Sequence, residues 1–130
     1  MKMLFLFIFF LLNMPAYAED SVSAPWYSVD NTGQVHLRVE MFLSSTCPHC
    51  EKANLFFQSV QANTPWLKIS RYFINQDPNA LQLLYQYRNT LNTSYYSVPS
   101  VFFCQTQWTG YDKDSNSGKA LMNGLNFCHD

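Results

Sequence analysis

The chain has 130 residues, which is enough for one domain and too few for two of ordinary size. Hydrophobic residues make up 48% of the chain and charged residues only 13%, so the sequence can build a packed core. The formal net charge of −1 gives no reason to expect nucleic acid or an anionic membrane surface as a partner.

Residues 1–18 have the features of a secretory signal peptide. A positive charge at Lys2 precedes a short apolar run, and small residues end the segment at Ala18. A membrane anchor is the alternative, but about 20 apolar residues are needed to span a bilayer, and this run breaks at Asn13 and Pro15. We therefore expect cleavage after Ala18 and a periplasmic or secreted protein without a stable membrane anchor, in a compartment where disulfides persist.

An irregular lead-in is predicted over residues 19–33, because Pro25, Asp30 and Gly33 interrupt any regular pattern. The folded domain is predicted over residues 34–130. Its first strand is indicated by four apolar residues that alternate with polar ones, namely Val35, Leu37, Val39 and Met41.

Two helices and a second strand are predicted next. The first helix begins near Pro48, ends at residues 63–65, and buries a face with helical spacing formed by Ala53, Phe56, Phe57 and Val60. Residues 67–74 form the second strand. Asp77 and Pro78 open the second helix, whose apolar side is predicted to hold Leu81, Leu84, Tyr85 and Leu91.

The last part of the chain predicts a hairpin and a final helix. Residues 100–103 form the third strand, and residues 107–111 a fourth, which is less clear because the turn between them lacks Gly or Asn-Gly. The final helix is spaced by Leu121, Leu125 and Cys128. The order β-α-β-α-β-β-α predicts an α/β fold: a mixed sheet, parallel in one half and antiparallel in the other, with helices covering both faces.

A Cys-Pro-His-Cys stretch, residues 47–50, lies where the first strand passes into the first helix. The first N–H groups of a helix lack internal partners, and the helix dipole favours an anion there, so this position suits a thiolate. One helical turn can bring the sulfurs of Cys47 and Cys50 together, while His49 can add positive charge or a hydrogen-bond donor beside Cys47. A structural staple would constrain little chain, and a zinc site would need two more ligands, so the pattern favours redox chemistry.

This segment resembles the active site of the thioredoxin superfamily, and its tetrapeptide is typical of DsbA-like periplasmic disulfide oxidases. A second stretch, residues 95–103, resembles the superfamily's cis-proline loop. The resemblance implies that Pro99 is a cis-proline facing the cysteines and that Val98 hydrogen-bonds the substrate backbone. It further implies that Cys47 exchanges with protein thiols or disulfides, that Cys50 resolves the mixed disulfide, and that a membrane redox partner resets the centre. No metal, nucleotide or organic cofactor is implied.

The sequence departs from the DsbA-like pattern in two respects. Only 48 residues separate Cys50 from Pro99, so no inserted helical domain fits, and a minimal thioredoxin scaffold is expected. The family often places a buried acid six residues before the first cysteine, where this chain has Met41. Glu40 could take that role after a shift of one residue, or it could lie on a solvated face.

Cys104 and Cys128 are the other two cysteines, and four cysteines allow three pairings. Adjacency favours pairing Cys47 with Cys50, which leaves Cys104 with Cys128. We expect this second pair to be a structural disulfide. A redox relay that draws electrons from the first pair is the alternative.

These features predict an exported thiol–disulfide oxidoreductase, and the tetrapeptide favours an oxidase. Two alternatives stay open. One is a dedicated periplasmic thiol reductase of the cytochrome-maturation type, which the minimal scaffold resembles. The other is a secreted binding module that uses the thioredoxin scaffold for shape alone.

Overall fold

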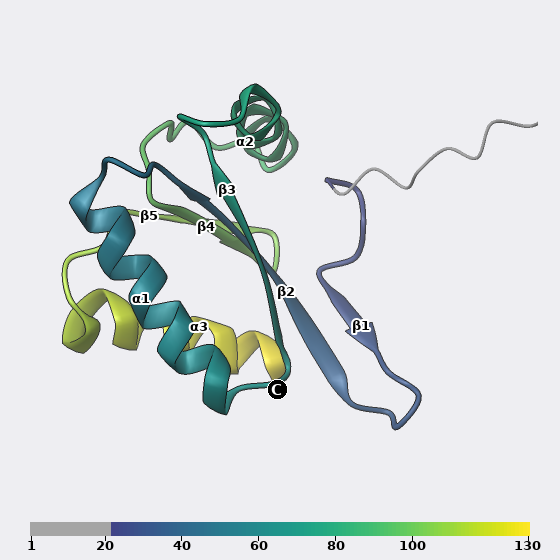
Figure 1. Cartoon of the computed structure of the whole chain (residues 1–130). Coiled ribbons are helices and arrows are strands. Elements are labelled where there is room, and N and C mark those ends of the chain that lie inside the picture. The colour runs from purple at the N-terminus through teal and green to yellow at the C-terminus, as the bar shows by residue number, and fades with distance from the viewer. Residues whose placement is uncertain (1–21) are drawn as a thin grey trace, which may run out of the picture.

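The computed structural model describes residues 22–130 (Figure 1), so the predicted signal peptide lies outside the described residues. The elements are β1 (Tyr27–Val29), β2 (Val35–Leu43), α1 (Pro48–Asn63), β3 (Leu67–Phe73), α2 (Pro78–Thr90), β4 (Ser100–Phe103), β5 (Thr106–Thr109), a π-helical turn (Asp114–Gly118) and α3 (Lys119–His129). Within this part of the chain, no helix combines the length and the apolar character needed to cross a membrane.

The sheet is built around β2. β3 pairs in parallel with β2 along one edge, from Leu37 to Leu43. β1 and β4 both pair antiparallel with β2, through its first and its later residues respectively, so they share the opposite edge. β5 extends the sheet beyond β4 as an antiparallel hairpin. The structure thus confirms the predicted mixed sheet, with a parallel β-α-β half and an antiparallel half.

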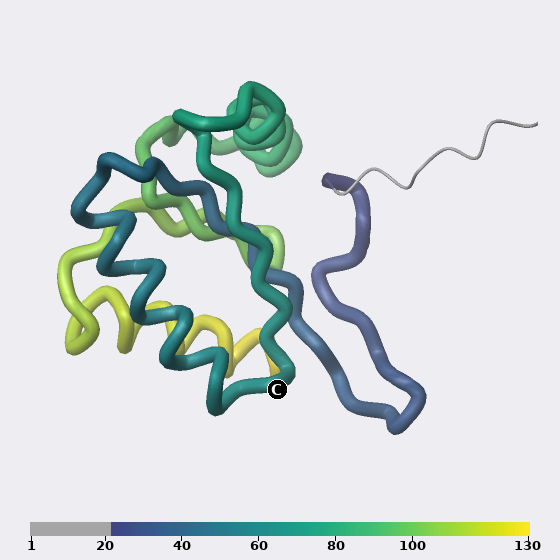
Figure 2. The backbone as a smooth tube through the Cα atoms, viewed as in Figure 1, coloured from purple at the N-terminus to yellow at the C-terminus, as the bar shows by residue number. Residues whose placement is uncertain are grey.

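Helices cover both faces of the sheet, as predicted. Alternate residues of β2 point to opposite faces because side chains alternate along a strand. One face packs under α1 and α3, which are drawn on the same side of the sheet in Figures 1 and 2, and its core includes Val39, Met41 and Phe57. The other face packs under α2, where Phe42 and Leu84 are fully buried.

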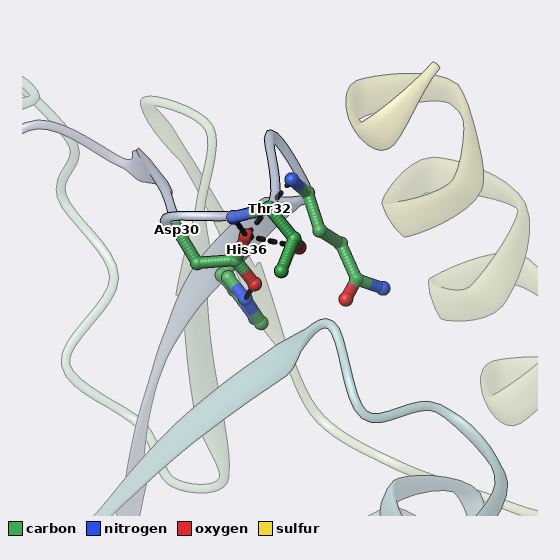
Figure 3. Close-up of polar contacts among 4 residues, drawn as sticks. Asp30, Thr32 and His36 are labelled. Atoms are coloured by element: carbon green, nitrogen blue, oxygen red, sulfur yellow. Dashed lines mark hydrogen bonds and ion pairs between the residues drawn. The ribbon is translucent and has the colours of Figure 1, made fainter.

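The predicted irregular lead-in is wrong in part, because β1 forms within it. The reason is the turn that joins β1 to β2, shown in Figure 3. One oxygen of the Asp30 carboxylate accepts hydrogen bonds from the Thr32 and Gln34 N–H groups and from the Thr32 hydroxyl, and His36 lies 2.8 Å from the other. Gly33 supplies the left-handed backbone angle, with φ at 83°. Asp30 and Gly33 therefore build a hairpin turn.

The predicted fourth strand is confirmed, although β5 starts and ends earlier than expected. The turn before it consists of Cys104 and Gln105, and both have left-handed angles, with φ of 47° and 63°. Two such residues make the tight turn that suits a two-residue hairpin, a role usually taken by Asn-Gly. The sequence gives little indication of this turn because neither residue normally favours that conformation.

The buried side of α2 differs from the prediction at one residue. Tyr85 is exposed, and the buried side chains are those of Ala80, Leu84, Tyr87 and Arg88. Tyr85 instead packs edge-on against Tyr96 of the loop before β4. The rest of the predicted side still faces the core, and Tyr87 packs against Phe102 of the sheet where Tyr85 was expected.

Candidate active site

Cys47 caps the N-terminus of α1. Its backbone is extended, and its Sγ accepts a hydrogen bond from the Cys50 N–H at 3.2 Å. Pro48 occupies the first helical turn, where a missing N–H costs nothing. Cys47 is partly exposed, at the end of the sheet where β2 stops. A thiolate here would receive a free N–H group of the helix and the favourable end of its dipole.

Cys50 lies one turn further on and is buried, with 2% of its surface exposed. The Ser44 N–H points at its Sγ from 3.5 Å. Burial, followed by the hydrogen bond with Cys47, raises the pKa of the Cys50 thiol to about 12. The two thiols therefore differ in exposure: Cys47 is partly accessible, and Cys50 is enclosed.

Val98 and Pro99 come to the cysteines because β4 pairs antiparallel with the end of β2. The peptide bond between them is cis. The Cys47 Sγ lies 3.9 Å from the Val98 carbonyl oxygen. An open groove of about 380 Å³ continues from here and is lined by His49, Val98, Pro99, Thr109, Gly110, Tyr111, Asp112 and Ser117. The tertiary fold thus brings together residues that lie 51 positions apart.

His49 is oriented by a backbone group that the sequence analysis did not identify. Its Nδ1 lies 2.8 Å from the Tyr111 carbonyl oxygen, and since a carbonyl can only accept, Nδ1 carries the proton. This nitrogen is therefore unavailable to Cys47, and only Nε2 of the ring lies outside this contact. No sequence pattern marks Tyr111 for this role, because the contact uses its main chain.

Tyr111 is itself held in place by its side chain. Its hydroxyl donates to the Asp114 carboxylate at 2.6 Å, and burial followed by this bond raises the pKa of the phenol. Gly118 permits the close packing, since a Cβ there would lie 2.8 Å from both the Phe56 ring and the Tyr111 hydroxyl. The Tyr111 main chain, which accepts the hydrogen bond from His49, is thus held in place by the packing of the Tyr111 side chain.

Glu40 takes neither of the two roles expected for it. It is buried, with 2% exposure, so it does not lie on a solvated face. It also points to the α2 side of the sheet, where Arg38, Tyr72 and Tyr87 surround it, and away from Cys50. Strand parity gives the position beneath the cysteines to Met41, which is fully buried in the same core as Cys50.

Cys104 and Cys128 are joined by a disulfide that links the β4–β5 turn to the last turn of α3. This bond lies far from Cys47. β4 carries the chain from Pro99 at the active-site end to Cys104 at the other end, a distance of about 16 Å for five extended residues. Direct thiol exchange between the two cysteine pairs needs their sulfurs in contact, and in this structure they lie at opposite ends of β4.

In residues 22–130, no group of three or more His, Cys, Asp or Glu side chains is arranged to hold a metal ion. Comparison with known proteins finds similarity among solved structures. No known protein family matches the sequence, and no curated protein matches it. A crystal structure of a glutaredoxin from Archaeoglobus fulgidus superposes with a TM-score of 0.48 and 23% identity, covering 65% of this chain and 84% of that one.

The topology of the chain defines its fold class. A parallel β-α-β unit, an antiparallel β-β-α unit, a Cys-x-x-Cys pair at the start of α1 and a proline at the start of β4 together make a thioredoxin-like fold. α1, β3 and α2 alone fill the stretch between Cys50 and Pro99, so the scaffold is minimal, as predicted.

Proposed function

We propose that this protein is a thiol–disulfide oxidoreductase that exchanges disulfides with other proteins through Cys47 and Cys50. The observation that carries the proposal is the contrast between the two sulfurs. Cys47 is partly exposed, accepts an N–H bond at a helix start and faces the Val98 backbone, whereas Cys50 is buried behind it. This contrast gives one sulfur for attack and one for resolution.

In the oxidising direction, a thiolate of the partner attacks the Cys47 sulfur of the oxidised centre. A partner–Cys47 disulfide forms and the Cys47–Cys50 bond breaks, so Cys50 leaves with the electron pair and takes a proton. A second partner thiolate then attacks its own half of the mixed disulfide and releases Cys47 as a thiolate. The partner loses two electrons and the centre gains them, and in our proposal a membrane redox partner later removes them.

The Val98 main chain is suited to hold an extended partner segment. It lies outside the β4–β5 pairing and borders the open groove beside Cys47. An extended peptide could add main-chain hydrogen bonds there, as in strand addition. We assign Val98 and Pro99 to substrate binding on this basis.

We further propose that the protein is exported. The signal-like features of residues 1–18 motivate this, and the Cys104–Cys128 disulfide supports it because such bonds persist in oxidising compartments. Detection of the protein, cleaved after Ala18, in a periplasmic or secreted fraction would test this part. A full-length product retained in the cytosol would contradict it.

We propose that the centre works as an oxidase. The helix N-terminus and the charge available from His49 both favour the reduced, thiolate form, which makes the disulfide oxidising. Equilibration of the Cys47–Cys50 pair against glutathione should give a potential above the thioredoxin value of about −270 mV, toward the DsbA value of about −120 mV.

Two activity measurements accompany the potential. The protein should introduce disulfides into a reduced protein faster than it reduces insulin with dithiothreitol. A potential at or below about −270 mV would identify a reductase instead. If neither reaction is accelerated, the protein is a binding module and the proposed function fails.

A further inference from the structure

The loop before β4, residues 92–98, carries Val98 to Cys47 and is held by the side chain of one residue in β5. The amide oxygen of Gln107 accepts a hydrogen bond from the Thr93 hydroxyl. Its amide nitrogen donates to the Tyr95 carbonyl at 3.2 Å and to the Ser100 hydroxyl at 3.1 Å. One side chain thus contacts the beginning and the middle of the loop and the first residue of β4 that follows it.

The orientation of the Gln107 amide is fixed by the chemistry of its neighbours. The Tyr95 carbonyl can only accept a hydrogen bond, so the nitrogen must face it. The Ser100 hydroxyl has a single proton and donates it to the Ser97 carbonyl at 2.6 Å, so it accepts from Gln107. Both amide protons and the amide oxygen of Gln107 are used in this way, and Ser100 is fully buried.

The other side of the loop is packed against α2. The Arg88 guanidinium lies 3.2 Å from the centre of the Tyr96 ring, and Tyr85 meets the same ring edge-on. The loop is therefore held from both sides just before Val98. Main-chain groups that are held in place before binding spare the partner the entropy cost of ordering them.

We infer that Gln107 is a positioning residue that presets the loop carrying Val98 for protein partners. The inference rests on the proposed function. Gln107 does not touch Cys47, so its loss should weaken binding of a protein substrate while the chemistry of the Cys47 sulfur stays the same. The side chain at position 107 must supply two donors and one acceptor at one place, so both its shape and its hydrogen-bonding groups matter for this role.

The test compares Gln107→Glu with Gln105→Glu. Both variants add the same charge to the same hairpin, but Gln105 is exposed at the turn. In Gln107→Glu, the introduced carboxylate keeps the bond from Thr93 and loses both donated bonds. We expect KM for insulin reduction to rise about 5- to 10-fold in Gln107→Glu, with the Cys47 alkylation rate by iodoacetamide unchanged, and neither to change in Gln105→Glu.

A pH series and amide exchange separate positioning from general damage. The KM ratio between the two variants should narrow as pH falls, because a protonated carboxyl regains one donor. Hydrogen exchange of residues 93–98 should rise in Gln107→Glu and, to a smaller extent, in Thr93→Val, while exchange in α1 stays as in the unmodified protein.

Equal KM values for the two variants, or alkylation of Cys47 slowed as much as insulin reduction, would overturn this inference and leave the proposed function standing. Unchanged exchange of residues 93–98 would do the same. An unmodified protein that neither oxidises nor reduces thiols would overturn the proposed function and, with it, this inference.

Discussion

At the scale of single residues, the site depends on where α1 begins. One helical turn separates Cys47, at the exposed start, from Cys50, beneath the apolar face that includes Ala53 and Phe57. Burial raises the pKa of Cys50 to about 12, so its thiol holds its proton at neutral pH. In the proposed mechanism, the same residue type can therefore serve two roles because the two environments differ.

Replacing Cys50 with alanine should leave the Cys47 thiolate able to attack a partner disulfide and form mixed disulfides that Cys50 can no longer resolve. Partner complexes should then accumulate and run as larger species on a non-reducing gel. The Cys47→Ala variant is the matched control and should give neither complexes nor turnover, since the remaining thiol is enclosed. Complexes that form through Cys50 in the Cys47→Ala variant would reverse the assigned roles.

At the scale of elements, the β4–β5 hairpin and α3 depend on each other. The hairpin turn places Cys104 in a left-handed conformation, and α3 brings Cys128 to it across 24 positions of the sequence. A cross-link over a loop of this length stabilises a fold by about 3–4 kcal/mol in the chain-entropy model. That is a large part of the net stability of a small domain.

The double replacement Cys104→Ser and Cys128→Ser should therefore lower the free energy of unfolding by about 3–4 kcal/mol, as read from urea denaturation. Where the variant is folded, it should still exchange disulfides at Cys47, because the two sites lie at opposite ends of β4. In the unmodified protein, mild reductant should open the Cys47–Cys50 bond well before the Cys104–Cys128 bond. Activity lost in a folded double variant would support the relay instead.

At the scale of the whole molecule, Glu40 joins three parts of the chain. The carboxylate lies on β2, 3.5 Å from the Arg38 guanidinium, with Tyr72 and Tyr87 beside it. Arg38 in turn donates to the Ala24 carbonyl and lies over the Trp26 ring. The segment before β1 is thus fastened to the α2 face. Burial raises the pKa of Glu40 above its ordinary value of 4.5, although its partners act in the opposite direction.

This shift gives a pH dependence of stability. Because the folded state holds the Glu40 proton more tightly than the unfolded chain, the stabilising contribution is full below about pH 4.5 and is lost as pH rises through the folded pKa. Glu40→Gln cannot titrate there. The stability of the unmodified protein relative to this variant should therefore be greatest in acid and decline above pH 4.5. Urea titrations at a series of pH values measure this, and a difference that grows with pH would contradict it.

Much of the fold could be read from the sequence because local patterns set it. Alternation marked β2, helical spacing and Asp77-Pro78 marked the helices, and the Cys-Pro-His-Cys stretch marked the start of α1. The predictions that were wrong involve non-local or unusual local conditions. The turn at Asp30 allows strand β1 to form within the predicted lead-in. In α2, Tyr87 rather than Tyr85 packs against the sheet.

The sequence by itself determined which residues can do chemistry: two cysteines one helical turn apart, a histidine between them and a Val-Pro pair at a strand start. Only the tertiary structure decided what surrounds them. It placed Glu40 on the α2 face of the sheet and Met41 in the core with Cys50. It also brought His49 to the Tyr111 carbonyl, and Gln107 to the loop that leads to Val98. These contacts use main-chain atoms and side chains from distant strands, and the pairing register that creates them is fixed by the packing of the whole sheet.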